Sequence, residues 1–465
     1  MPRPFPLPFR QQRVTAGAAI AALLLLPIPA AAADPLAAVV TDPASKQAPG
    51  CIAARFERGQ MTAMAASGYA DIKRRTPIDP DTLFYGASLS KQFTALAAAT
   101  LIAQGKLSLD DDARDHLPDL PRYAVPVTVG MLMHHSAGIR DSLGLLRLAG
   151  MDNVGLASKR QALNLVYAQA DTAFTPGTQY RYSNGGYLLL AEIVERVAGE
   201  PFALYADRAI FKPLGMAQSH FLNDAQPRPG RVAHGYVPVD GGFAIRDSFP
   251  RFSGSGGLMI SLSDLARFER DIAIERKVWT PAVARIMLTP GRFSGGSPIR
   301  DAKLDMGYGG GLHIGPLKGE YRVQHGGSAE GFKHSYVRMP ERHRAFALLC
   351  NRGDWSASER MERIIAASDT ASDPAARTPP AGLFRSAELG ADYALAPDGE
   401  RLMVRISSRT AGPRARTLQF VRQPDGSYAA DTIRIRFGTD PDRFTVSRGG
   451  SGDIGFERVK KGRTE

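Results

Sequence analysis

Residues 86–91 read Gly-Ala-Ser-Leu-Ser-Lys, and this stretch says more about the protein than any other part of the chain. Ser88 and Lys91 stand three positions apart at the start of a helical pattern that Gly105 ends. Residues at i and i+3 share a helix face, so we expect the serine hydroxyl beside the lysine amine. A serine needs a nearby base to act as a nucleophile, and a lysine becomes a base when burial or a neighbouring cation lowers its pKa. The alternative for so short a motif is a helix N-cap followed by a solvated lysine.

The length and charge of the chain restrict its class. Its 465 residues favour two domains, with one large core as the alternative, and 44% hydrophobic and 22% charged residues are typical of a soluble globular protein. The densest basic runs, Lys73-Arg74-Arg75 and Lys460-Lys461, are short and far apart. A nucleic-acid-binding protein would show a basic stripe, so we expect solvated surface and no nucleic-acid partner.

Residues 1–33 predict a secretory signal peptide. Arg3, Arg10 and Arg13 precede a mostly apolar run at residues 16–26, and Ala31-Ala32-Ala33 forms a small-residue cleavage site. A membrane span needs about 20 apolar residues, so this run is too short for one. We expect a periplasmic or secreted protein with no stable membrane span, an uncleaved anchor being the alternative. Cleavage lowers the formal net charge from +12 to +9, because it removes three arginines and no acidic residue.

The chain contains two cysteines, Cys51 and Cys350. Export would allow a disulfide between them, and two buried free thiols are the alternative. Their separation excludes a Cys-x-x-Cys metal site, and no His-Glu-x-x-His motif occurs. His134 and His135 are adjacent, so they cannot share a helix face. We expect no metal and no cofactor.

The first region, residues 34–365, has strand patterns at both ends and a helical middle. The strand patterns cover residues 50–58, 61–70, 320–325, 332–338 and 343–350. Residues 157–200 are largely helical in pattern. We therefore predict an α+β fold, in which one mixed antiparallel sheet is built from both ends of the domain around a large helical region.

A second region follows a linker. Residues 366–381 are rich in Ala, Ser, Asp, Thr and Pro, a composition typical of linkers. Beyond them the hydrophobic pattern has period two, in short runs at 402–406, 417–421, 432–437 and 443–446. Asp398-Gly399 and Asp425-Gly426 are hairpin signals. Residues 382–465 are thus predicted to form a separate all-β unit, a small antiparallel barrel or sandwich.

Two further motifs can carry chemistry. In Tyr182-Ser183-Asn184, a tyrosine near a lysine ammonium can shuttle a proton, and Asn184 can donate to a substrate carbonyl while accepting from a lysine. In His325-Gly326-Gly327-Ser328, the two glycines let a substrate backbone approach a strand edge, and His325 can donate to a leaving group or a substrate carboxylate. Taken alone, the first is more simply a core aromatic beside a helix cap and the second a histidine in a hairpin turn.

In this order, the three motifs resemble those of the serine hydrolases of the class C β-lactamase and DD-peptidase superfamily, which includes penicillin-binding proteins, D-aminopeptidases and β-lactamase-like esterases. The resemblance covers roughly residues 48–352. Its secondary markers are the segment 77–91 that leads to the nucleophile, the segment 127–138 that contains the turn after a short helix, and Gly256-Gly257-Leu258 with Ser263-Asp264.

The resemblance implies a role for each motif residue. Ser88 would be the acylated nucleophile, Lys91 its base or the electrostatic partner of Tyr182, and Tyr182 the general base and acid. The oxyanion hole would consist of the backbone N–H groups of Ser88 and Ser328. The implied catalytic residues are Ser88, Lys91, Tyr182 and His325, and the implied substrate-binding residues are Asn184, Gly326, Gly327 and Ser328.

One departure from the family pattern bears on the substrate. β-Lactamases of this class carry Lys-Thr-Gly where this chain has His325-Gly326-Gly327. An unperturbed histidine is mostly neutral near pH 7, whereas a lysine is a lasting cation suited to a carboxylate. The sequence therefore favours hydrolysis of peptides, amides or esters, with D-amino-acid and peptidoglycan-derived peptides among the candidate substrates. The alternatives are a β-lactamase and a catalytically silent peptidoglycan-binding or receptor protein on the same fold.

The resemblance also concerns the cysteines and the second region. The family sheet would place strand 50–58 antiparallel to strand 343–350, which brings Cys51 close to Cys350. We expect this proximity and leave the disulfide open. Residues 382–465 resemble the small β-barrel domains appended to some D-aminopeptidase-like members, and residues 454–458 would close such a barrel.

Overall fold

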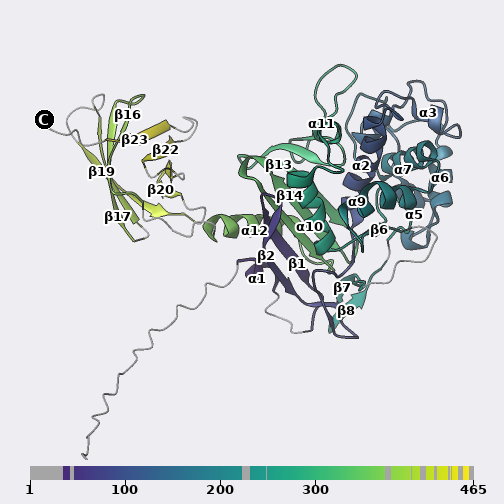
Figure 1. Ribbon diagram of the computed structural model, residues 1–465, viewed down its shortest axis with the longest axis horizontal. Coiled ribbons are helices and arrows are strands. Elements are labelled where there is room, and N and C mark those ends of the chain that lie inside the picture. Colours follow the sequence, from purple (N-terminus) through teal and green to yellow (C-terminus); the bar gives the residue numbers. More distant parts are fainter. Residues whose placement is uncertain are drawn as a thin grey trace, which may run out of the picture. The chain divides into compact units, whose positions relative to one another are not determined.

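The computed structural model contains a central sheet whose strands come from distant parts of the chain (Figure 1). Its eight strands lie in the order β10-β11-β12-β13-β14-β15-β1-β2, and every neighbouring pair is antiparallel. Their bounds are β1 Cys51–Glu57, β2 Gln60–Ser67, β10 Arg300–Asp301, β11 Met306–Tyr308, β12 His313–Leu317, β13 Glu320–Ser328, β14 Lys333–Met339 and β15 Arg344–Cys350. The predicted α+β fold, with a sheet built from both ends of the region, is confirmed.

The structure describes residues 35–41, 47–222, 231–247, 249–371, 379–399, 401–408, 415–423, 427–437, 440, 442–448 and 454–459. The predicted signal peptide, the Asp425-Gly426 turn and the Lys460-Lys461 pair lie outside these residues.

Strand β1 is buried on both faces of the sheet. Ile52, Ala54 and Phe56 belong to the main core, which the strands share with the helical region. Cys51 and Ala53 point the other way, into a second core formed with α1 (Pro35–Val40) and α12 (Ala357–Ala371). Successive side chains of a strand point to opposite faces, so one strand contributes to both cores. The sheet is therefore the middle of three layers.

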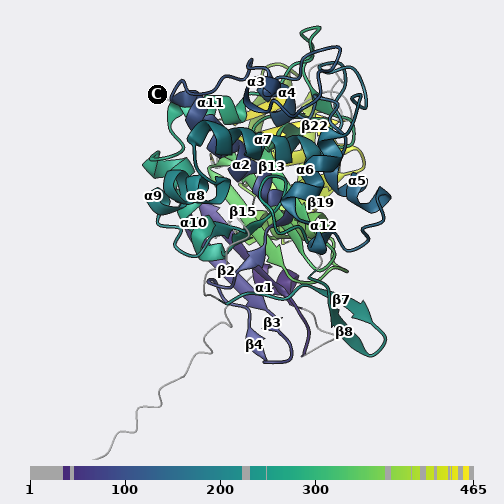
Figure 2. The ribbon, with the colours of Figure 1, turned by 90° about the vertical axis from the view of Figure 1, so that its right-hand side faces the viewer.

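The helical region packs on the face of the sheet that contributes to the main core (Figure 2). Its helices are α2 Ser90–Ala103, α3 Ala113–His116, α4 Val129–Met133, α5 Ser142–Leu148, α6 Lys159–Tyr167, α7 Asn184–Ala198, α8 Phe202–Ala206, α9 Lys212–Leu214, α10 Leu262–Arg270 and α11 Pro281–Leu288. Helix α2 is buried from Ser90 to Leu101 and packs against α7 and α11. Within the described ranges, no helix has the length and apolar character needed to cross a bilayer.

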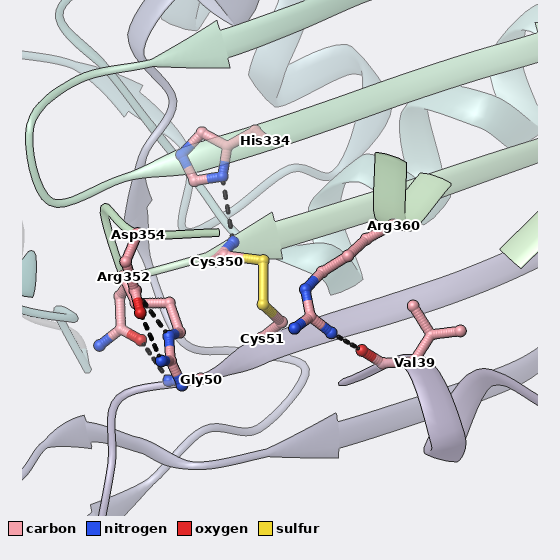
Figure 3. The surroundings of a disulfide bond; sticks show 9 residues. Val39, Gly50, Cys51, His334, Cys350, Arg352, Asp354 and Arg360 are labelled. Atoms are coloured by element: carbon pink, nitrogen blue, oxygen red, sulfur yellow. Dashed lines mark hydrogen bonds and ion pairs between the residues drawn. A yellow bond between two sulfur atoms is a disulfide. The ribbon is translucent and has the colours of Figure 1, made fainter. Parts of the chain in front are cut away.

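A disulfide joins Cys51 of β1 to Cys350 of β15 (Figure 3). The two residues face each other in the antiparallel register, and their Cα atoms are 4.0 Å apart. Both cysteines are fully buried, and the backbone N–H of Cys350 donates to Nδ1 of His334 at 3.2 Å. The expected proximity is confirmed, and the bond closes a loop with a sequence separation of 299 residues.

The second region forms a closed eight-stranded barrel, as predicted. Its strands are β16 Gly382–Ser386, β17 Ala391–Asp398, β18 Arg401–Ser408, β19 Arg416–Arg422, β20 Tyr428–Ala430, β21 Ile433–Phe437, β22 Arg443–Arg448 and β23 Ile454–Arg458. Strand β23 pairs with β16 and so closes the barrel. Aromatic side chains fill its interior, among them the stacked pair Phe444 and Phe456.

The predicted linker 366–381 needs a correction at its start. Helix α12 continues to Ala371, so residues 366–371 are helical. The helix is anchored by Met361, Ile364 and Ile365, which pack into the second core, and the alanine-rich composition that suggested a linker is also favourable for helix. Residues 372–378 lie outside the described part of the chain. The division into units at 34–365 and 382–465 stays a prediction.

The disulfide should contribute strongly to stability, because it restricts the unfolded chain over a long loop. We predict that the double variant Cys51→Ala/Cys350→Ala has a free energy of unfolding lower by about 2–4 kcal/mol, measured by urea denaturation. The control is wild-type protein whose urea denaturation is measured in the presence of a reductant. Its urea midpoint should equal that of the variant. Equal midpoints for oxidised wild type and variant would contradict the prediction.

Candidate active site

Ser88 lies on a tight turn that leads into α2. The turn is a single 3-10 segment, Ala87–Leu89, and Ala87 has a φ of 47°. A left-handed backbone costs an ordinary residue about 1–2 kcal/mol, and such strain is common at functional sites. Hydrogen bonds hold the turn, since the N–H of Gly86 donates to the carbonyl of Leu258 at 2.7 Å. The α-helix therefore begins at Ser90, two residues later than expected, and Ser88 itself lies on the strained turn.

The Lys91 side chain is fully buried and its amine has three acceptors. Nζ donates to Ser88 Oγ at 3.2 Å, to Asn184 Oδ1 at 2.8 Å and to the Ser255 carbonyl at 2.9 Å. Burial lowers the pKa of Lys91 to about 7, and the charge of Asp141 opposes this. The structure therefore brings Ser88 and Lys91 together as predicted and removes the alternative of a solvated lysine.

Tyr182 lies on the other side of this pair. Its ring centroid is 4.7 Å from Lys91 Nζ, and its hydroxyl lies beside Ser88. Burial raises the pKa of Tyr182 above its usual value, although the neighbouring Ser88 hydroxyl opposes the shift. Tyr182 is thus a neutral phenol at the nucleophile near pH 7.

Asn184 begins α7 and connects Lys91 to a carboxylate. Its Oδ1 accepts from Lys91, and its Nδ2 donates to Asp141 Oδ2 at 2.7 Å. Sequence reasoning missed Asp141 and also the Ser255 carbonyl. The only signal for Asp141 is its position as N-cap of α5, and a backbone carbonyl such as that of Ser255 has no sequence signal at all.

His325 is placed near the site, but both of its ring nitrogens are engaged within the protein. Nδ1 donates to the Gly326 carbonyl at 2.6 Å, so Nε2 accepts from the Tyr308 hydroxyl at 3.1 Å. The side chain is 5% exposed, and burial lowers its pKa well below the usual value. His325 is therefore a neutral, fixed side chain, and in this arrangement it offers no N–H to a leaving group.

The two glycines after His325 differ in their surroundings. A Cβ at Gly327 would lie 2.4 Å from the Gly86 carbonyl oxygen, whereas one at Gly326 would meet only the His334 carbonyl, at 3.3 Å. Gly327 thus allows β13 to pack against the nucleophile turn, and Gly326 lies exposed. This close packing places Ser328 at the cleft that also contains Ser88.

A cleft opens beside Ser88. It is lined by Tyr85, Ala87, Ser88, Leu143, Arg147, Val154, Asn184, Phe249, Pro250, Ser255, Gly256, Ser328, Ala329 and Glu330. Tyr85 and Phe249 stack with ring centroids 4.0 Å apart and form an aromatic wall. Of the lining residues, Arg147 and Glu330 are charged. In the described ranges no group of three or more His, Cys, Asp or Glu side chains is placed to hold a metal ion.

The family described as Beta-lactamase matches residues 36–371, well over half of the chain. The chain belongs to this family. It is a serine hydrolase, and the geometry around Ser88 fits that class.

Two curated relatives and one solved structure are similar to this β-lactamase-family hydrolase. The D-aminopeptidase of Gluconobacter oxydans is 28% identical over 375 residues, which are 79% of this chain and 69% of the relative. Penicillin-binding protein 4* of Bacillus subtilis is 28% identical over 327 residues, 67% of this chain and 70% of the relative. The octameric penicillin-binding protein homologue from Pyrococcus abyssi aligns with a TM-score of 0.62 at 23% identity, over 89% of this chain and 97% of its own, and this likeness supports the fold.

Two neighbouring glycines test how tightly the site is packed. A Cβ at Gly185 would lie 2.3 Å from the Arg140 carbonyl oxygen, whereas one at Gly186 would have its nearest neighbour at 3.5 Å. We predict that Gly185→Ala lowers the free energy of unfolding by about 1–3 kcal/mol and slows the reaction of Ser88, because it displaces Asn184. Gly186→Ala is the matched control and should retain stability and reactivity. Thermal unfolding and the rate of fluorophosphonate labelling measure both effects, and equal behaviour of the two variants would contradict the prediction.

Proposed function

We propose that this hydrolase cleaves amide bonds of amino acids and short peptides, D-amino-acid derivatives in particular, through an acyl-enzyme on Ser88. The observation that carries the proposal is the placement of Lys91. A buried amine in contact with Ser88, with a pKa of about 7, is available as a base at neutral pH.

The hydrogen bonds of Lys91 explain how the base would be oriented. A neutral amine has two N–H donors and one lone pair. The Asn184 and Ser255 oxygens, at 2.8 and 2.9 Å, take the two donors. The lone pair is then left for Ser88, at 3.2 Å. We therefore propose that Lys91 takes the serine proton during acylation.

Tyr182 would act in the next step. As Ser88 Oγ bonds to the substrate carbonyl carbon and the C–N bond breaks, the leaving nitrogen needs a proton. Tyr182 is a phenol beside Ser88 and so lies near that nitrogen. It would donate its proton there and recover the one taken by Lys91. Water then hydrolyses the ester, and Ser88 regains its proton.

The oxyanion that forms on the substrate carbonyl would accept from the backbone N–H groups of Ser88 and Ser328. Both residues line the cleft, and β13 packs directly against the nucleophile turn through Gly327. Loss of one such donor typically costs about 3 kcal/mol of transition-state stabilisation.

Features of the cleft support an amino-acid substrate. Its apolar lining, including Leu143, Val154 and Phe249, fits an uncharged side chain. Glu330 at the cleft is half exposed and forms a long, exposed ion pair with Arg246 at 3.9 Å, which a free amino group of the substrate would replace. His325 is neutral and so does not replace the lasting cation of β-lactamases. The D-aminopeptidase name of the Gluconobacter relative agrees with this substrate class.

We also propose that the protein is exported to the periplasm or secreted after cleavage of residues 1–33. The disulfide between Cys51 and Cys350 supports this location, because structural disulfides persist mainly in oxidising compartments. Peptidoglycan-derived peptides would be accessible there as substrates.

Turnover of a substrate panel tests the proposed function. We expect D-Ala-p-nitroanilide to give a higher kcat/KM than nitrocefin, short-chain p-nitrophenyl esters or D-Ala-D-Ala peptides, and Ser88→Ala to abolish both turnover and fluorophosphonate labelling. Unchanged labelling of Ser88→Ala would refute the assigned nucleophile. A preference for nitrocefin would instead favour a β-lactamase, and stoichiometric binding of D-Ala-D-Ala peptides without any turnover would favour a receptor.

The pKa of Lys91 predicts a pH dependence. The lysine must be neutral to accept the serine proton, so the acylation rate should rise with pH, with a midpoint near 7, and then level off. Fluorophosphonate labelling rates between pH 5 and 9 measure the profile. A rate that does not change until about pH 10, the range of an ordinary lysine or tyrosine, would refute Lys91 as the base.

A further inference from the structure

One short segment holds the Tyr182-Ser183-Asn184 motif in place. The backbone N–H of Ser183 donates to Nδ1 of His135 at 3.2 Å, and the backbone N–H of Asn184 donates to Asp141 Oδ2 at 2.8 Å. Gly185 packs against the carbonyl of Arg140 so closely that a Cβ would lie 2.3 Å away. Residues 135–141 therefore form a bracket around the start of α7.

Asp141 has two separate tasks in this bracket. Its Oδ1 accepts from the N–H of Gly144 at 2.7 Å and so caps α5. Its Oδ2 accepts both from the backbone N–H of Asn184, at 2.8 Å, and from Asn184 Nδ2, at 2.7 Å. The first task serves the helix and the second serves the site.

The contact with Asp141 fixes which way the Asn184 amide points. With Nδ2 toward the carboxylate, Oδ1 faces the Lys91 amine at 2.8 Å. With the amide rotated by 180°, Oδ1 would face the carboxylate and Nδ2 would face Lys91, so both contacts would lose their donor–acceptor match. A carboxylate accepts hydrogen bonds only, so Asp141 allows one of the two orientations.

We propose that Asp141 is a positioning residue for acylation. It orients the Asn184 amide as an acceptor for Lys91, and the lone pair of the Lys91 amine is then directed at Ser88. The inference rests on the roles proposed above for Ser88 and Lys91. It does not depend on which substrate the enzyme cleaves.

The charge of Asp141 acts on Lys91 as well. Titratable or charged groups facing Lys91 come from several elements, and they are Asp141, His135, Tyr182, Tyr187 and His325. Burial keeps both histidines neutral by lowering their pKa, and it keeps both tyrosines protonated by raising theirs. Asp141 is thus the anion among these groups, and its loss should lower the pKa of Lys91.

The variant Asp141→Ser separates the two tasks of Asp141. Serine is a good N-cap, so its hydroxyl can still accept from Gly144. The serine side chain is too short to hold the Asn184 amide, and it lacks the second oxygen that Asp141 uses for this contact. The matched control is Asp112→Ser, because Asp112 caps α3 with similar backbone angles and a bond to the N–H of Arg114, and does not line the cleft.

We expect Asp141→Ser to reduce the maximal rate of fluorophosphonate labelling at least tenfold and to move the pH midpoint of labelling below that of the wild type. Asp112→Ser should keep both the rate and the midpoint, because serine retains the N-cap and Asp112 does not contact Asn184. Wild-type rates and an unshifted midpoint in Asp141→Ser would overturn the proposal. A loss of rate that only parallels the loss of folded protein in both variants would also overturn it.

A second measurement separates this proposal from the proposed function. The Lys91 amine can be titrated by NMR in protein labelled with ¹³Cε-lysine, its signal being the one absent from Lys91→Met. We expect a lower midpoint in Asp141→Ser than in wild type, and equal midpoints would overturn the role of Asp141. If the wild type is not labelled at Ser88, the proposed function fails, and the NMR comparison still decides whether Asp141 controls Lys91.

Discussion

The fully buried amine of Lys91 is the constraint on which the rest of the site depends. An amine without partners in the protein interior is very costly, so every N–H must have an acceptor. The acceptors come from three parts of the chain: the nucleophile turn, the start of α7 and the glycine-rich segment that contains Ser255. The hydrogen bonds of this one side chain therefore fix the relative positions of three segments. Burial at the same time lowers the pKa of Lys91 into the range where it can act as a base.

The sheet supplies the rigid support for this arrangement. Strands β1 and β15 pair directly, with Cys51 opposite Cys350, and both faces of the pair are covered by packed layers. A slip of one residue would exchange the two faces, so the register is strongly specified. Strand β13 belongs to the same sheet, and the close approach of Gly327 to Gly86 transmits this fixed register to the nucleophile turn. The disulfide and the active site thus rely on one framework.

Much of the site followed from residue type and spacing. The pairing of Ser88 with Lys91 was predicted from helical periodicity, and Asn184 was predicted to accept from a lysine, as it does. Asp141 was missed because an aspartate before a helix has the ordinary explanation of an N-cap. The engagement of both His325 nitrogens was also not predictable, because Tyr308 is 17 residues away and only the sheet brings it close. The extension of α12 to Ala371 depended on a core that the sequence pattern does not show.

By itself, the sequence determined the fold class, the all-β character of residues 382–465 and the residues that can carry the chemistry, because periodicity and short motifs can be recognised without tertiary contacts. Tertiary structure decided how those residues act. It buried Lys91 and so lowered its pKa, it buried Tyr182 and so kept it a phenol, and it directed His325 inward. These outcomes depend on solvent exclusion and on partners from distant segments, which arise only when the chain is folded.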